Sequence, residues 1–118
     1  MPAQIHYVQA NIPVLLFREG DTWIMYTPAL DVSSSGSTQA EVKKNFNEAV
    51  EVFLETIYKD GTRDEVLFNL GWRKIEERKL IAPSLTESPP SVRKGIPTHL
   101  LSQAQRVHRR VRIPVGVA

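Results

Sequence analysis

Apolar and polar positions alternate most regularly between Thr38 and Gly61. Apolar residues recur there at steps of three and four, which places them along one face of an α-helix. These residues are Val42, Phe46, Ala49, Val50, Phe53 and Ile57. Thr38 and Glu41 have the spacing of a capping box, in which each side chain accepts a hydrogen bond from the other residue's backbone N–H. Because Gly61 suits the left-handed position after a helix, the pattern predicts a half-buried helix over 38–61.

The residues before this helix predict β-strands. Residues 4–17 are rich in β-branched and aromatic types and predict a first strand. Pro13 cannot donate to a sheet ladder, so this strand is expected to lie at an edge or to break there. A polar turn with glycine leads to a second strand over 22–27, and part of 29–37 is a candidate for a short third strand. Both early strands carry apolar residues on two faces, which predicts a homodimer or a higher oligomer.

The pattern after Gly61 is less regular. Thr62 and Glu65 have the spacing of a second capping box, which predicts a short helix ending near Leu70. The segment 72–81 fits neither helical nor strand periodicity cleanly, so both structures stay open.

The last third of the chain begins with a break in pattern. Four prolines with serine and glycine over 82–97 predict a linker without stable structure of its own. Residues 98–105 have room for two helical turns. After them the apolar residues alternate with polar ones, which predicts a strand with period two. Its apolar positions are Val107, Val111, Ile113, Val115 and Val117, and only Arg109 breaks the set.

An exposed apolar row of that kind is an aggregation hazard, so we expect the C-terminal strand to be paired. One candidate pairing joins residues 12–17 with 111–117, because Pro13 and Pro114 both mark sheet edges. The chain thus predicts an α+β fold, in which a small antiparallel sheet of three to four strands packs on one long helix. We divide it into a domain over 1–81, a linker over 82–97 and a basic tail over 98–118.

Composition narrows the class of protein. A chain of 118 residues with 42% hydrophobic and 24% charged residues is ordinary for one globular domain. No apolar run approaches the roughly 20 residues that cross a bilayer, and the N-terminus lacks the features of a secretion signal. The absence of cysteine excludes disulfides and the usual structural zinc sites. A cytoplasmic protein is expected.

The small net charge of +2 hides an asymmetry. All 13 acidic residues lie at or before Glu87, and the segment after it contains only basic ones. Four of these gather in the C-terminal strand: Arg106, Arg109, Arg110 and Arg112. Such a cluster attracts phosphates or an acidic protein surface. The alternative interpretation is a solubilising face that blocks unwanted strand pairing. No recognised DNA-reading motif accompanies the charge, so contact with DNA stays uncertain.

The residues suited to catalysis or metal binding do not form a recognisable set. His6, His99 and His108 are scattered, and none has the spacing of a metal-ligand pair. Asp21 and Asp31 flank the second strand, but both occupy positions typical of turn residues. The serine run 33–35 precedes a helix N-terminus, where capping and turn formation are the favoured roles. We therefore expect no metal, no cofactor and no enzymatic activity.

Turn and helix positions in the middle of the chain follow a recognisable order: Pro28, Leu30, Gly36, Thr38, Glu41, Asn45, Ala49 and Leu54. In these positions the chain resembles the HicB-like antitoxin family. The Gly20–Asp21 turn before them and the run 70–72 after them also look like a variant branch, and the resemblance covers about residues 12–72.

The resemblance implies a β-β-β-α-β arrangement related to a pared-down ribonuclease H fold. It also implies a protein that binds and blocks a small messenger-RNA-cleaving toxin of the HicA type. Members of the family often carry a separate DNA-binding domain, and no standard one follows here. Three functions are therefore considered: a toxin-binding antitoxin, a solitary oligomeric accessory protein without a toxin, and nucleic-acid binding through the basic tail.

Overall fold

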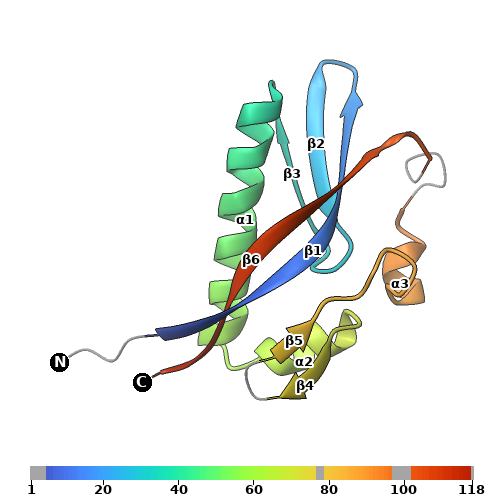
Figure 1. The fold of residues 1–118 in the computed structure, drawn as a ribbon. Coiled ribbons are helices and arrows are strands. Elements are labelled where there is room, and N and C mark those ends of the chain that lie inside the picture. The colour runs from blue at the N-terminus through green and yellow to red at the C-terminus, as the bar shows by residue number, and fades with distance from the viewer. Residues whose placement is uncertain (1–4, 77–78, 97–101, 118) are drawn as a thin grey trace.

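The chain folds around a four-stranded antiparallel sheet with the strand order β3-β2-β1-β6 (Figure 1). The computed structural model describes residues 5–76, 79–96 and 102–117. The strands are Ile5–Glu19 (β1), Thr22–Thr27 (β2), Val32–Gly36 (β3) and Gln105–Val117 (β6). One long helix, Gln39–Lys59 (α1), packs on one face of this sheet, so the predicted α+β class is confirmed.

The start of α1 follows the predicted cap with one difference. The Thr38 hydroxyl accepts a hydrogen bond from the Glu41 N–H at 3.0 Å, as predicted. The Glu41 carboxylate accepts from the N–H of Ser37 at 3.3 Å, one residue earlier than the Thr38 N–H that the capping box predicted. At the other end Gly61 has φ +72°, the left-handed conformation expected there.

The buried face of α1 differs from the prediction at three positions. Ala49 and Phe53 are only half-buried, whereas Leu54 is 2% exposed. Successive residues lie about 100° apart around a helix, so the row formed by steps of four passes through Leu54 and leaves Phe53 at its rim. The buried residues of α1 are Val42, Phe46, Val50, Leu54 and Ile57.

The first three strands form two consecutive hairpins. β1 pairs with β2 from Leu15 to Glu19, and Gly20 makes the turn with φ +61°. The third strand, a candidate within 29–37, is present: β3 pairs with β2 along its whole length. It ends at Gly36, where an added Cβ would lie 2.6 Å from the backbone nitrogen of Val42. Only glycine therefore lets α1 start so close to the sheet.

The C-terminal strand is paired, as predicted, but in a different register. β6 begins at Gln105 and runs antiparallel to β1, with Leu16 opposite Gln105 and Ile5 opposite Val117. The candidate pairing of 12–17 with 111–117 is therefore wrong, because residues 111–117 lie opposite the first part of β1 and residues 12–16 lie opposite 105–109. Both strands are used almost in full.

Pro13 lies where β1 has a neighbour on one side only. It is opposite His108 of β6, whereas pairing with β2 begins two residues later, at Leu15. The missing N–H of Pro13 is therefore tolerated, and the edge inferred from this proline is confirmed locally. The hydroxyl of the buried Thr27, the last residue of β2, donates to the Pro13 carbonyl at 2.8 Å.

After α1 the chain forms a short helix and a small hairpin. The helix Arg63–Asn69 (α2) is present, but the second capping box is wrong. The Thr62 hydroxyl donates back to the Ile57 carbonyl at 3.4 Å, so it caps no N–H of α2. The open segment 72–81 contains two strands, Arg73–Glu76 (β4) and Lys79–Ile81 (β5), which pair antiparallel.

The hairpin is attached to the body through a tryptophan. Trp72 is 3% exposed, and its indole N–H donates to the carbonyl of Ala29 at 2.7 Å. This bond satisfies the polar edge of a buried ring and ties the loop after β2 to the chain that follows α2.

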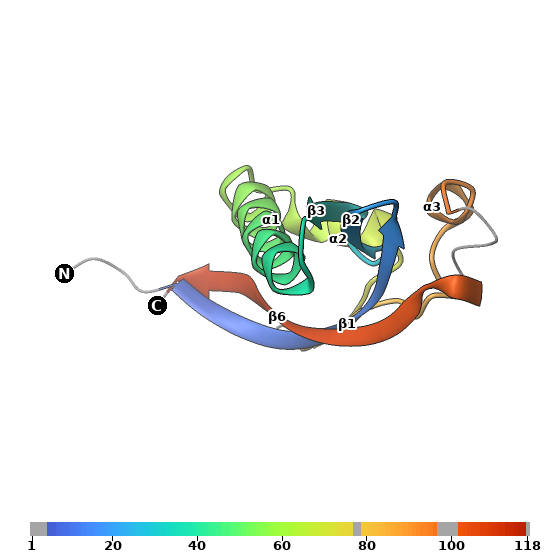
Figure 2. The same ribbon diagram turned by 90° about the horizontal axis from the view of Figure 1, so that it is seen from above.

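The proline-rich segment is ordered in its described part, residues 82–96. It contains a short helix, Pro90–Arg93 (α3), which lies away from α1 in both views (Figures 1 and 2). Val92 and Ile96 are each 8% exposed, so a linker without stable structure of its own is not what forms. Of the helical turns expected over 98–105, residues 98–101 lie outside the described residues, 102–103 are helical, and Gln105 already belongs to β6.

Candidate functional site on the β1–β6 ribbon

The first part of β1 and most of β6 form a two-stranded ribbon beyond the other strands. We define the β1–β6 ribbon as residues 5–14 together with 107–117, a stretch over which β1 has no pairing with β2. The ribbon passes below α1 and carries both ends of the described chain (Figures 1 and 2). Because side chains alternate along each strand, the ribbon has two chemically different faces.

The inner face belongs to the hydrophobic core. Ala10, Ile12 and Val14 are buried there, and across the ribbon Val111 and Ile113 are buried with them. They pack with the buried face of α1 in one cluster.

Arg109 lies among these apolar residues, opposite Ile12. Its guanidinium NH2 group donates to the side-chain carbonyl oxygen (Oδ1) of Asn47 on α1 at 2.8 Å. This contact explains why one arginine interrupts the apolar row of β6. It holds the middle of β6 to the helix.

The outer face of the ribbon is polar and basic. Gln9 lies opposite Arg112 and Asn11 lies opposite Arg110, and all four side chains are exposed. The Arg112 guanidinium lies over the ring of Tyr7, 4.7 Å from its centroid, in a cation–π contact. Residues 5–14 and 107–117 include no aspartate or glutamate, so no acidic residue of the ribbon itself offsets this positive charge.

The structure divides the four predicted arginines. By strand alternation, Arg106, Arg110 and Arg112 share the outer face, and all three are exposed. Arg109 is on the inner face and is engaged with Asn47.

Three residues of β1 accompany the arginines and were not predicted as site residues: Tyr7, Gln9 and Asn11. The signal that would have found them is the same period of two, applied to the first strand.

A groove runs beside the ribbon, between α1 and β6. It encloses a volume of about 240 Å³, with Val50 and Leu54 among its lining residues. The helix side carries Glu51 and Glu55, and the ribbon side carries Tyr7 and three arginines: Arg109, Arg110 and Arg112. β6 is the last strand in the sheet order, so its edge on this side has no strand neighbour within the described chain.

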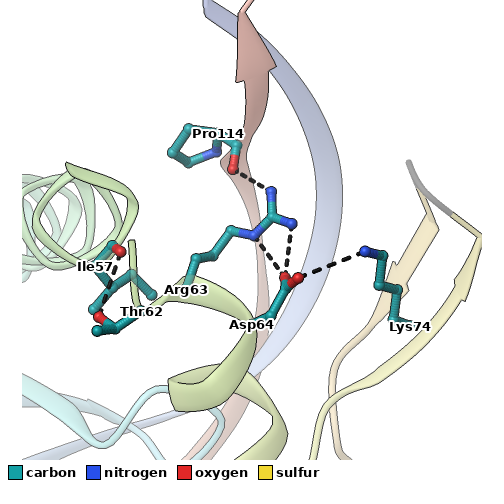
Figure 3. A network of polar contacts seen from close by, with 6 residues as sticks. All are labelled: Ile57, Thr62, Arg63, Asp64, Lys74 and Pro114. Atoms are coloured by element: carbon teal, nitrogen blue, oxygen red, sulfur yellow. Dashed lines mark hydrogen bonds and ion pairs between the residues drawn. The ribbon is translucent and has the colours of Figure 1, made fainter. Parts of the chain in front are cut away.

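A polar network fixes the far end of β6 to α2 and β4 (Figure 3). The Arg63 guanidinium donates to the Pro114 carbonyl at 2.8 Å and makes two hydrogen bonds, at 2.9 and 2.7 Å, to one carboxylate oxygen of Asp64. The ammonium of Lys74 lies 3.5 Å from the other oxygen. The hydrogen bonds from Arg63, followed by the nearby positive charges, lower the pKa of Asp64.

The other candidates for chemistry are not brought together. Asp21 and Asp31 lie at opposite ends of β2, where Asp21 pairs with Arg18 at 3.7 Å and Asp31 accepts from the Tyr26 hydroxyl at 2.7 Å. Burial, reinforced by that bond, raises the pKa of Tyr26. The serines 33–35 form part of β3 and alternate between its two faces. Within the described residues no three histidine or acidic side chains form a possible metal site, and His99 lies outside them.

The chain was compared with protein-family models, with curated proteins and with solved structures. None of the three comparisons gave a match. The resemblance to HicB-like antitoxins therefore depends on its turn and helix positions alone. Across the part of the chain that the structure describes, no helix has the length and apolar character needed to span a membrane.

Proposed function

We propose that the protein is a non-enzymatic, antitoxin-like module that binds a small RNA-cleaving toxin of the HicA type in the cytoplasm. The single observation that carries the proposal is the groove between α1 and the edge of β6. The resemblance supplies the class of partner, and the groove supplies a place where a protein segment would fit.

Proteins commonly bind an extended peptide at an exposed sheet edge. The added strand forms main-chain hydrogen bonds with the edge, and its side chains enter pockets along the groove. β6 is 13 residues long, and one side of it pairs with β1. Pro114 would not contribute to an added strand, because it has no N–H and its carbonyl already accepts from Arg63. Arginines along β6 oppose pairing of this edge with a second copy of itself, because antiparallel pairing about its middle would place like charges across from each other.

The helix side of the groove suits a basic partner. Glu51 is exposed and Glu55 is half-buried, and both line the groove. Complementary charge at such a rim steers association and selects the partner. We expect a HicA-type toxin to be small and basic, so these carboxylates would face its positive charges.

Co-purification with a HicA-type toxin, followed by titration, tests the proposal. Glu51→Arg should weaken toxin binding by roughly tenfold or more, because it places a like charge against a basic partner. Glu48→Arg is the matched control: it makes the same charge change on the same exposed side of α1, but Glu48 does not line the groove. Equal binding by parent and Glu51→Arg protein, or equal losses in the two variants, would contradict the proposed surface.

Exposed apolar side chains favour a second candidate, a solitary homo-oligomeric accessory protein. Phe68 of α2 is 76% exposed and Ile75 of β4 is 54% exposed, which is unusual for such large apolar groups. Light scattering at micromolar concentration is then expected to give a mass above the 13.4 kDa of one chain. A mass of one chain would rule out this candidate and leave toxin binding by a monomer.

A further inference from the structure

We infer that the outer face of the β1–β6 ribbon is a binding site for double-stranded DNA, which it would contact through the major groove. We call this set the outer ribbon face: Tyr7, Gln9, Asn11, Arg110 and Arg112. The inference does not rest on toxin binding, although the two surfaces overlap: Tyr7, Arg110 and Arg112 also line the groove, whereas Gln9 and Asn11 do not. The proposed site also differs from the separate DNA-binding domain that members of the HicB-like family often carry.

The shape of the ribbon suits a groove. The major groove of B-DNA is about 12 Å wide and admits a two-stranded β-ribbon. Over residues 5–14 the sheet is reduced to β1 and β6, since pairing with β2 begins only at Leu15. Paired strands lie about 4.8 Å apart, so the backbone leaves room for side chains on either flank.

The charge of this face points to a polyanion. Arg110 and Arg112 form no ion pair within the described residues, and no acidic side chain belongs to the ribbon. Arg110 and Arg112 also line the groove that Glu51 and Glu55 line, but neither guanidinium forms an ion pair with these carboxylates. A phosphate would therefore not have to displace a salt-bridge partner from either arginine.

The residue types and their spacing favour DNA over an acidic peptide. Arginine makes two hydrogen bonds to guanine, and asparagine or glutamine makes two to adenine, at the major-groove edges. Here Gln9 lies opposite Arg112, and Asn11 lies opposite Arg110. Side chains on one face of a strand repeat about every 6.8 Å, which equals roughly two base-pair steps. An acidic peptide would give no reason for amide groups beside each guanidinium.

The cation–π contact adds order to one end of the site. With its guanidinium over the Tyr7 ring, Arg112 is held in a defined position before DNA arrives. Fixing a long side chain in advance lowers the entropy cost of binding.

Fluorescence anisotropy with the full chain and a labelled duplex of about 20 base pairs, roughly two turns, tests the inference. The parent should bind, and its affinity should fall steeply between about 50 and 200 mM salt. The double variant Arg110→Ala/Arg112→Ala should lose at least about tenfold in affinity and show a shallower salt dependence. The matched control, Arg93→Ala/Lys94→Ala, removes the same charge from exposed residues at α3 and should stay within about twofold.

A second pair of variants tests recognition of bases. In selection from random duplexes the parent should enrich a preferred sequence, and Gln9→Ala/Asn11→Ala should relax that preference while retaining most non-specific affinity. All these residues are exposed, so the variants should fold normally, and their circular dichroism and melting temperatures should match the parent's.

Several results would overturn the inference. One is no binding to the duplex at about 50 mM salt, and another is an equal loss in the control variant. Equal competition by a poly-glutamate peptide would show a surface that responds to charge alone. Equal competition by double-stranded RNA would also count against it, because the deep, narrow major groove of A-form RNA does not admit the ribbon.

Discussion

The two faces of the β1–β6 ribbon show how neighbouring residues of one type acquire different roles. Arg109 and Arg110 are adjacent in the sequence, yet Arg109 donates to Asn47 beneath α1 and Arg110 is exposed beside Asn11. One arginine holds the ribbon to the helix, and the other is available to a partner. The period of two in a strand, and not the basic composition of the tail, decides which arginines can bind anything outside the molecule.

The faces also differ in what they would bind. In the groove beside α1, carboxylates stand across from Arg109, Arg110 and Arg112, so a protein segment of mixed charge is the better fit. On the outer face the amides of Gln9 and Asn11, which do not line the groove, stand beside Arg112 and Arg110, so DNA is the better fit. The following predictions test how separate the two faces are.

Removal of residues 98–118 should have the largest effect. It deletes β6 and with it the buried side chains of Val111 and Ile113, and it leaves residues 5–14 of β1 without a paired strand. Each buried aliphatic side chain contributes about 1.5–3 kcal/mol, so the loss is comparable with a typical total stability of about 5–15 kcal/mol. We expect a large fall in melting temperature or dissociation of an oligomer. Unchanged mass and melting temperature would show that β6 contributes nothing to the body.

Single substitutions on the two faces should differ sharply. Ile113→Ala on the inner face removes a fully buried side chain and should lower the free energy of unfolding by about 2–5 kcal/mol. Arg112→Ala, one residue earlier on the outer face, should change it by no more than about 0.5 kcal/mol. Urea denaturation of the two variants measures both values. Similar losses would mean that the faces are not separate.

A rise to alkaline pH should have the smallest effect on stability. It tests whether the sheet beyond the ribbon is covered from solvent. Tyr26 lies opposite Leu15, beyond the ribbon, and burial raises its pKa. Unfolded tyrosine ionises near pH 10, so above that pH the unfolded state releases this proton more readily and stability falls. Below about pH 10 the contribution of protonated Tyr26 to stability is fully present.

The parent should therefore lose stability more steeply than Tyr26→Phe between about pH 10 and 11.5. The difference should be well under about 1.4 kcal/mol per pH unit, because the ring is only half-buried and solvent screens the effect. Parallel pH profiles of the two proteins would contradict this.

The periodic parts of the fold were predictable from the sequence. Apolar residues recur every three or four positions over α1 and every two positions over β6, because one face of each element meets the core. Neighbouring residues in the sequence are enough to reveal this pattern. The register of β6 on β1 was not predictable, because it depends on a match between distant segments. The order of the proline-rich segment was missed for the same reason, since Val92 and Ile96 are buried through contacts that no local pattern reports.

Part of the candidate site could be predicted from the sequence. Alternation alone separates Arg109 from the other three arginines, since it falls in the apolar row of β6. Its partner Asn47, on a helix far away in the sequence, required the structure. The period of two picks out Gln9 and Asn11 as polar positions of β1, but only the pairing with β6 places them beside Arg112 and Arg110.

The pairing of β1 with β6 has a consequence for how the protein folds. It joins segments about 100 positions apart, the kind of non-local contact that slows folding because a long loop must close first. The hairpins of β1, β2 and β3 and the helix α1 can form from local contacts before it. Until β6 arrives, the first ten residues of β1 have no strand on either side. During that interval the chain is most exposed to association with other unfinished copies, so refolding yield should fall as protein concentration rises.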